Sequence, residues 1–246
     1  METALALIAG GFIGAALGLV GAGGAMLSVP ILMYGFGLDP KPATTAALAV
    51  VLLAALSGLI PKVRKKQVLY RDAFVIWGIG SVTNLGFSSI VDQIPDSVIT
   101  TGFAGVLILA GASMLRPPKL DEQKRMPFPV LVLLSLVIGT MTGLFGIGGG
   151  FLAIPVLVLY FGTPQVVAAG TSLLIISVNS LTAFVGHRSQ WADVQWHIPI
   201  LMGASAIVIA QIASQFSHKT SPVLLRRGFA YLLFTISLFT IFKTYL

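Results

Sequence analysis

The chain has 246 residues, of which 56% are apolar and 9% are charged, and it contains no cysteine. A soluble domain carries about a quarter charged residues, so this composition excludes a water-soluble protein, and the lack of cysteine excludes disulfides and thiolate chemistry. The net charge of +7 does not indicate a nucleic-acid partner, because basic residues flank membrane helices for topological reasons. We therefore predict an all-α polytopic membrane protein that has no cofactor and no metal site.

Ten apolar spans follow one another along the chain. Most are long enough to cross a hydrocarbon core about 30 Å thick. Two of them, 25–36 and 151–161, are too short for this and have the length of re-entrant half-helices. No Lys or Arg precedes the first span, so we expect a membrane helix there rather than a signal peptide. The spans cover residues 4–20, 25–36, 43–60, 73–91, 98–115, 128–145, 151–161, 166–186, 198–214 and 223–242.

The first glycine-rich motif is GLVGAGGAMLSVP, residues 18–30. Each glycine in a helix costs up to about 1 kcal/mol relative to alanine, so the motif predicts a helix break. The half-helix after the break presents unpaired backbone N–H groups and a partial positive charge, which bind anions. Gly21, Gly23 and Gly24 are therefore candidate substrate-binding residues. The alternative is that these small residues only let helices pack closely.

The motif returns as GLFGIGGGFLAIP at residues 143–155. Residues 13–48 and 138–173 share 14 identities at a fixed offset of 125, so the chain is an internal duplication. Two breaks related by an inverted repeat would meet near the membrane midplane, where secondary transporters bind substrates. The second motif adds the candidates Gly146, Gly148, Gly149 and Gly150.

The duplication predicts three parts of the chain. They are a first transmembrane repeat over 1–115, a cytoplasmic connecting loop over 116–127, and a second transmembrane repeat over 128–246. The basic run KVRKK at 62–66 and the basic connecting loop should both be cytoplasmic, and the hairpin tip at 92–96 should be outside. Loop charges in the second half favour inverted repeats, with a parallel repeat as the alternative.

Polar residues follow both half-helices. Thr44 and Thr45 correspond roughly to Thr171 and Ser172, and further polar residues, such as Ser180, lie deeper in the spans. Hydroxyl and amide groups can donate to an oxyanion without bringing a second charge into the bilayer. The alternative is that they satisfy their own helix backbone or bridge neighbouring helices. The candidates of this type are Thr44, Thr45, Asn84, Thr171, Ser172 and Asn179.

Acidic residues lie at or near the ends of the spans, so we expect no carboxylate at the midplane. Cation exchangers and proton pumps usually need one there. The substrate is therefore expected to be an anion, and any coupling to protons would have to use His187, His197 or Asp72.

At these residues the chain resembles the TauE/SafE family of membrane proteins, known as sulfite or organosulfonate exporters. The resemblance rests on GLVGAGGAMLSVPIL and GLFGIGGGFLAIPVL, followed by ATTAALAVV and AAGTSLLII respectively. It implies transport of sulfite, sulfonates or related sulfur-containing anions across a bacterial inner membrane, whereas the composition alone indicates only a small anion. The TTAAL of the first half departs from the GTSLL of the second, so a symmetric pair of binding hydroxyls does not follow. By motif position the resemblance implicates Gly21, Gly23, Gly24, Gly146, Gly148, Gly149, Thr171 and Ser172.

The leading hypothesis is a secondary transporter that moves small sulfur-containing oxyanions, in the direction of export, and is not an enzyme. The alternatives are an anion channel and a non-transporting membrane assembly subunit. An intramembrane hydrolase using Ser172 or Ser180 with His187 has little support, because no carboxylate accompanies the histidine. The expected partners are the small anion and the lipid bilayer, and a homodimer is one assembly that the sequence allows.

Overall fold

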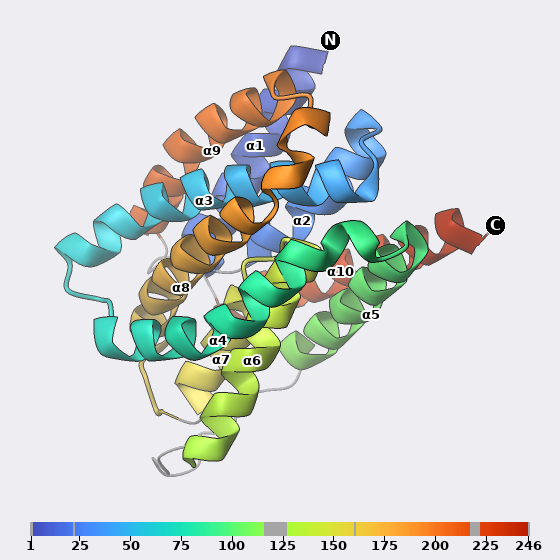
Figure 1. Ribbon diagram of the computed structural model, residues 1–246. Coiled ribbons are helices and arrows are strands. Elements are labelled where there is room, and N and C mark those ends of the chain that lie inside the picture. Colours follow the sequence, from blue (N-terminus) through green and yellow to red (C-terminus); the bar gives the residue numbers. More distant parts are fainter. Residues whose placement is uncertain (1, 22, 116–126, 160, 217–221, 246) are drawn as a thin grey trace.

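Each apolar span expected from the sequence contains a helix in the computed structural model (Figure 1). The structure describes residues 2–21, 23–115, 127–159, 161–216 and 222–245, and no strand occurs within them, which confirms the all-α fold class. The first half holds α1 (Glu2–Val20), α2 (Gly23–Pro30), α3 (Pro40–Arg64), α4 (Tyr70–Ile90) and α5 (Asp96–Leu115). The second half holds α6 (Phe128–Phe145), α7 (Gly150–Leu159), α8 (Gln165–Gly186), α9 (His197–Phe216) and α10 (Pro222–Tyr245). A π-helical turn, Ile31–Gly35, extends α2, and short 3-10 helices, Val91–Gln93 and Arg188–Asp193, follow α4 and α8.

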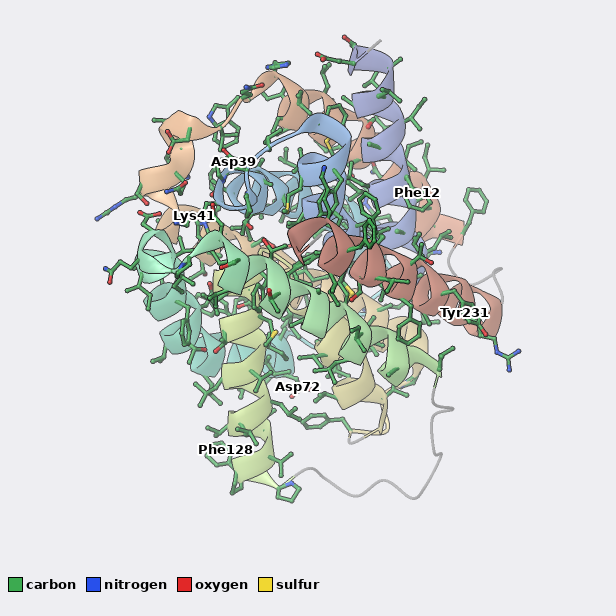
Figure 2. The ribbon with its side chains drawn as sticks, turned by 90° about the vertical axis from the view of Figure 1, so that its right-hand side faces the viewer. Phe12, Asp39, Lys41, Asp72, Phe128 and Tyr231 are labelled. Carbon is green, nitrogen blue, oxygen red and sulfur yellow. The ribbon has the colours of Figure 1, made fainter. Side chains whose placement is uncertain are left out.

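Six of these helices are long and apolar enough to cross a membrane, namely α1, α3, α4, α6, α8 and α9. Large apolar side chains also face outward. Val82 on α4 and Leu109 on α5 are each 71% exposed, and Phe12, Phe128 and Tyr231, labelled in Figure 2, lie on the outside of the bundle. So extensive an apolar surface requires lipid rather than water around it. The protein is a multi-pass membrane protein.

The helices α3 and α8 form the centre of the molecule (Figure 1). In each, 72% of the apolar window is buried inside the protein, against 28–44% in the other four long helices. The two helices run antiparallel. Thr45 at the start of α3 contacts His187 at the end of α8, and Lys62 near the end of α3 lies against Gly170 near the start of α8.

The remaining long helices pair across the two halves of the chain. The first helix of each half packs on the fourth helix of the other, α1 on α9 and α6 on α4. Glycines allow these close contacts, because a Cβ atom on Gly14 would lie 2.6 Å from the Ala206 carbonyl oxygen. The equivalent helices α5 and α10 also pack on each other, and Ser237 Oγ donates to the Ala104 carbonyl at 2.9 Å.

Candidate functional site

Both glycine-rich motifs interrupt their helices, as the sequence predicts. After α1 the chain turns at Gly21, whose φ is +82°, and α2 begins at Gly23. After α6 the turn is longer, because Gly146, Gly148 and Gly149 have φ values of +66°, +72° and +69°. Only glycine adopts such angles without strain. The two breaks are therefore unequal, although their sequences match closely.

Each break rests on the long central helix of the other half. A Cβ atom on Gly21 would lie 2.9 Å from Ala169 Cα of α8. A Cβ atom on Gly146 would lie 2.9 Å from Thr44 Cγ2 of α3. Ala169 and Thr44 are separated by the repeat offset of 125, so the two contacts are equivalent. The pair α3 and α8 thus brings both motifs to the centre of the molecule.

Gly148 lies between α3 and α8, where it faces a buried polar side chain. A Cβ atom on this residue would lie 2.9 Å from Ile176 Cγ2, 3.5 Å from Val51 Cγ1 and 3.2 Å from Ser180 Oγ. Ser180 is fully buried, and its hydroxyl has no hydrogen-bond partner among the residues that the structure describes. An unpaired buried hydroxyl is costly, so this one is a candidate ligand contact beside the start of α7.

A second buried donor, the side-chain amide of Asn179, lies next to Ser180 in the chain. Asn84 of α4 donates through Nδ2 to the backbone oxygen of Asn179 at 3.0 Å, and its Nδ2 lies 3.3 Å from Asn179 Oδ1. Both side chains are fully buried. Within the described part of the chain, Asn179 Nδ2 and Asn84 Oδ1 have no hydrogen-bond partner. The structure therefore brings the two predicted asparagines together and leaves one amide donor available.

Ser172 connects the two breaks. Its Oγ atom lies 3.0 Å from the carbonyl oxygen of Gly21 and 3.0 Å from that of Gly150. The hydroxyl has one hydrogen, so it donates to one of these carbonyls at a time. Ser172 and Ser180 are eight residues apart on α8 and share a helix face. That face points toward the second break.

Two of the predicted hydroxyls have structural partners instead. Thr171 Oγ1 donates to the Val167 carbonyl at 2.8 Å and accepts the Leu69 N–H at 3.0 Å, so it holds the end of the 65–69 segment. Thr44 Oγ1 donates to the Pro40 carbonyl at 2.8 Å in its own helix.

Two of the predicted glycines face the first helix of their own half instead of the polar cluster. Gly24 packs on α1, because its Cβ atom would lie 2.8 Å from Leu17 Cγ. The equivalent Gly149 packs on α6, with its Cβ position 3.1 Å from Thr142 Oγ1. Gly23 begins α2.

His187 joins three helices at the end of α8. Its Nε2 atom lies 2.8 Å from the Gly143 carbonyl, which can only accept, so Nε2 carries a hydrogen. Its Nδ1 atom lies 3.1 Å from Thr45 Oγ1, and the single hydrogen of that hydroxyl is shared between Nδ1 and the Lys41 carbonyl, which is also 3.1 Å away. Burial lowers the pKa of His187 below its ordinary value of 6.5, although the Gly143 hydrogen bond and the charge of Asp92 both raise it. The lowered pKa favours the neutral ring.

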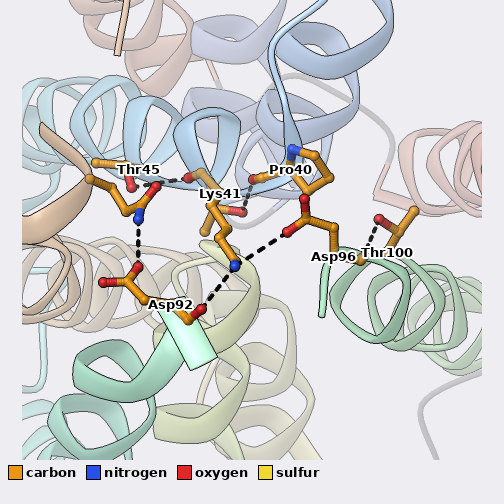
Figure 3. Close-up of polar contacts among 8 residues, drawn as sticks. Pro40, Lys41, Thr45, Asp92, Asp96 and Thr100 are labelled. Atoms are coloured by element: carbon orange, nitrogen blue, oxygen red, sulfur yellow. Dashed lines mark hydrogen bonds and ion pairs between the residues drawn. The ribbon is translucent and has the colours of Figure 1, made fainter. Parts of the chain in front are cut away.

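Charged residues surround this end of the bundle. Lys41 at the start of α3 donates to the Asp92 carbonyl at 3.1 Å and lies 3.6 Å from the Asp96 carboxylate (Figure 3). Gln190 donates to the Asp92 carboxylate. These contacts tie the hairpin tip between α4 and α5 to α3 and to the segment after α8. We call the residues 39–41, 92–96 and 188–193 the acidic end.

The described acidic residues avoid the centre of the molecule, as the sequence predicts. They are at the start of helices or in the segments between them, at Glu2, Asp39, Asp72, Asp92, Asp96 and Asp193. Asp121 and Glu122 lie outside the described residues. Where the structure describes the chain, no three His, Asp or Glu side chains gather as metal ligands would.

In the sequence analysis Ser180 is named among the deeper polar residues and as a possible nucleophile, but not among the substrate-binding candidates. Its spacing from Ser172 and Asn179 on the same predicted helix could have identified it as a binding candidate. The sequence does not show that this face of the helix points toward the second break.

Comparison with known proteins gives one family over most of the chain. The family model described as "Sulfite exporter TauE/SafE" matches residues 6–240. A "Probable membrane transporter protein" of Xylella fastidiosa (strain Temecula1) is 27% identical over 245 residues, which cover 96% of this chain and 94% of the relative. The "Probable membrane transporter protein YunE" of Bacillus subtilis is 26% identical over 89% of this chain and 90% of its own length. A "Sulfite exporter TauE/SafE family protein 5" of Arabidopsis thaliana is 37% identical over 65 residues, which are 26% of this chain and 14% of that protein.

Proposed function

Since the chain belongs to the TauE/SafE family of membrane transporters, we propose that it exports small sulfur-containing oxyanions such as sulfite or sulfonates. The observation that carries the proposal is the second helix break, where left-handed glycines lead into α7 beside the unpartnered hydroxyl of Ser180. The proposed membrane is a bacterial inner membrane, and the proposed assembly is a homodimer.

The groups at the second break suit an anion. The first N–H groups of a helix have no partner in an earlier turn and carry a partial positive charge. Ser180 Oγ and Asn179 Nδ2 add hydrogen-bond donors, and the described carboxylates all lie elsewhere. A pyramidal or tetrahedral oxyanion can accept from several such donors at once. We propose Gly148, Gly150, Asn179 and Ser180 as the substrate contacts, with Gly21 and Gly146 shaping the breaks and Ser172 joining them.

The energetics favour export without ATP. Moving one negative charge out of an inside-negative cell gains about 2.3 kcal/mol per 100 mV. Hydrolysis is less well supported than transport, because both ring nitrogens of His187 contact Gly143 and Thr45 rather than Ser172 or Ser180. We infer that the protein is not an enzyme.

The alanine variant Ser180→Ala tests the proposed contact. It removes a buried hydroxyl that has no described partner, so the free protein should be as stable as the wild type or slightly more stable. Lost donation to the anion should weaken sulfite binding by about fivefold to tenfold, the equivalent of ~1 kcal/mol. The measurement is the rise of the melting temperature with sulfite concentration, together with sulfite flux in proteoliposomes.

The matched control is Ser177→Ala, one helical turn away. Ser177 is 3% exposed and donates to the Leu173 carbonyl at 2.8 Å, so its loss should leave the sulfite response unchanged. An unaltered sulfite response in Ser180→Ala would contradict the site. Ohmic anion currents in the wild type would favour the channel, and an absence of flux in pure liposomes would favour the assembly subunit.

We also propose that the two repeats are inverted in the membrane. The proposal is supported by the antiparallel contacts of the equivalent helices α3 and α8. A two-fold axis that relates two antiparallel helices is perpendicular to them, so for membrane-spanning helices it lies in the membrane plane. The basic run at 62–66 then faces the cytoplasm and the acidic end faces outward. The connecting loop, 116–127, lies almost wholly outside the described residues.

Cysteine labelling tests this orientation cleanly, because the chain has no native cysteine. A cysteine at Lys65 should react with an impermeant thiol reagent only from the cytoplasmic side. Cysteines at Asp96 and Gln190 should react only from outside. Labelling of Gln190→Cys from the same side as Lys65→Cys would contradict the inverted repeat and support a parallel one.

A further inference from the structure

Two buried basic residues occupy equivalent positions of the repeats. Lys62 near the end of α3 and His187 at the end of α8 are 125 residues apart, which is also the offset between the two glycine-rich motifs. They are 2% and 0% exposed, whereas every other Lys, Arg or His with a described side chain is at least partly exposed. Basic residues at the ends of membrane helices usually extend toward lipid headgroups and water. Lys62 therefore differs from the rest of the KVRKK run, which the sequence indicates only as a topology signal.

The surroundings of the two residues are also equivalent. His187 contacts Thr45 near the start of α3. Lys62 lies against Gly170 near the start of α8, where its Cβ atom is 3.1 Å from the Cβ position of that glycine. Thr45 and Gly170 are again 125 residues apart. Each basic residue thus lies where the end of one central helix meets the start of the other, at opposite ends of the α3 and α8 pair.

Both residues form hydrogen bonds to other segments at their ends of the helix pair. His187 contacts Thr45 and donates to the carbonyl of Gly143, three residues before the turn at Gly146. At the other end, the Lys62 carbonyl accepts the Gln67 N–H at 2.9 Å. Lys62 and His187 thus lie at the two ends of the helix pair on which the second break rests.

The two ends differ in charge. Residues 62–72, which we call the basic end, contain five basic residues and one acidic residue. The acidic end contains four acidic and two basic residues, of which Lys41 is paired with Asp96. The charge of Asp92 acts on His187, Lys41 donates to the Asp92 carbonyl, and Arg188 adjoins His187 in the chain. An anion is therefore attracted at one end and repelled at the other.

We propose that Lys62 is the residue that captures the anion at the basic end and that His187 is its weaker counterpart at the acidic end. The proposal rests on the proposed transport of anions. A buried ammonium group attracts an anion more strongly than an exposed one, because solvent screens it less. A neutral imidazole offers only hydrogen bonds. This difference leaves the transport equilibrium unchanged, but the KM for an anion that enters from the basic end is lower than the KM for one that enters from the acidic end.

The experiment measures uptake of radiolabelled sulfite by proteoliposomes in which the protein has one orientation, with KM determined from each end. Lys62→Met should raise the KM from the basic end by about tenfold or more, since hydrogen bonds to charged groups contribute about 1.5–3 kcal/mol. The KM from the acidic end should change by less than about twofold, because the group removed acts at the other end. Lys62→Arg should recover most of the affinity, because it retains the charge.

Lys65→Met is the matched control, because Lys65 is an exposed member of the same run and its loss removes the same formal charge. An equal effect of Lys65→Met and Lys62→Met on KM would overturn the proposal in favour of a diffuse surface potential. A fall in maximal rate at unchanged KM in Lys62→Met would overturn it as well, since that is the result of a structural lysine. If wild-type protein moves no sulfite or methanesulfonate in either orientation, the proposed function itself fails, independently of Lys62.

Discussion

Gly148→Ala is expected to lower the transport rate by about tenfold or more, whereas Gly37→Ala should transport at close to the wild-type rate. The two glycines share a φ of +72°, so alanine costs the same backbone strain at both positions, about 1–2 kcal/mol. They differ in their surroundings. A Cβ atom on Gly37 would have nothing within 4 Å, but one on Gly148 would lie 2.9 Å from Ile176 Cγ2 and 3.2 Å from Ser180 Oγ.

The comparison separates backbone strain from the site. Both variants should show a similar loss of melting temperature from strain, with some additional loss in Gly148→Ala from the contact with Ile176. Transport is measured per folded molecule, as sulfite flux in proteoliposomes at matched protein density. Equal flux in the two variants would show that the second break shapes the fold but does not contact the anion. Gly149 is unsuitable for this test, because it packs on α6 and its substitution would disturb that contact.

Gly80→Ala is expected to destabilise the protein strongly, while Gly78→Ala, two residues earlier in α4, stabilises it. The Cβ atom of an alanine at 80 would lie 2.5 Å from the Ser135 carbonyl oxygen of α6, so the helices must separate. Overpacking of this kind costs about 1–3 kcal/mol. At 78 nothing lies within 4 Å, and alanine gains up to about 1 kcal/mol of helix propensity.

The measurement is thermal unfolding in detergent, followed by the loss of the monodisperse species. Opposite shifts of the melting temperature are expected for two variants that have the same change in composition. If both shifts are small, α4 and α6 are not held at the close distance that Gly80 permits. The pair therefore tests the cross-half packing of α4 on α6 directly.

The amino-acid sequence by itself determined the features that depend on local physics. Runs of apolar residues fix the membrane helices, because each must satisfy its own backbone within the hydrocarbon core. Runs of glycine fix the two breaks, since the cost of glycine in a helix is a local term. The placement of acidic residues at helix ends follows from the cost of burying charge in lipid. Repetition at an offset of 125 revealed the duplication without any structure.

The tertiary structure decided which residues of each motif face which neighbour. Two near-identical glycine motifs form breaks of different length, and Gly149 packs on α6 while Gly148 faces Ser180. Thr171 supports a connecting segment, although its neighbour Ser172 reaches both breaks. Lys62 is buried within a run of exposed basic residues. These outcomes depend on the rotation and crossing of helices that are far apart in the chain, and no local pattern of residue types specifies them.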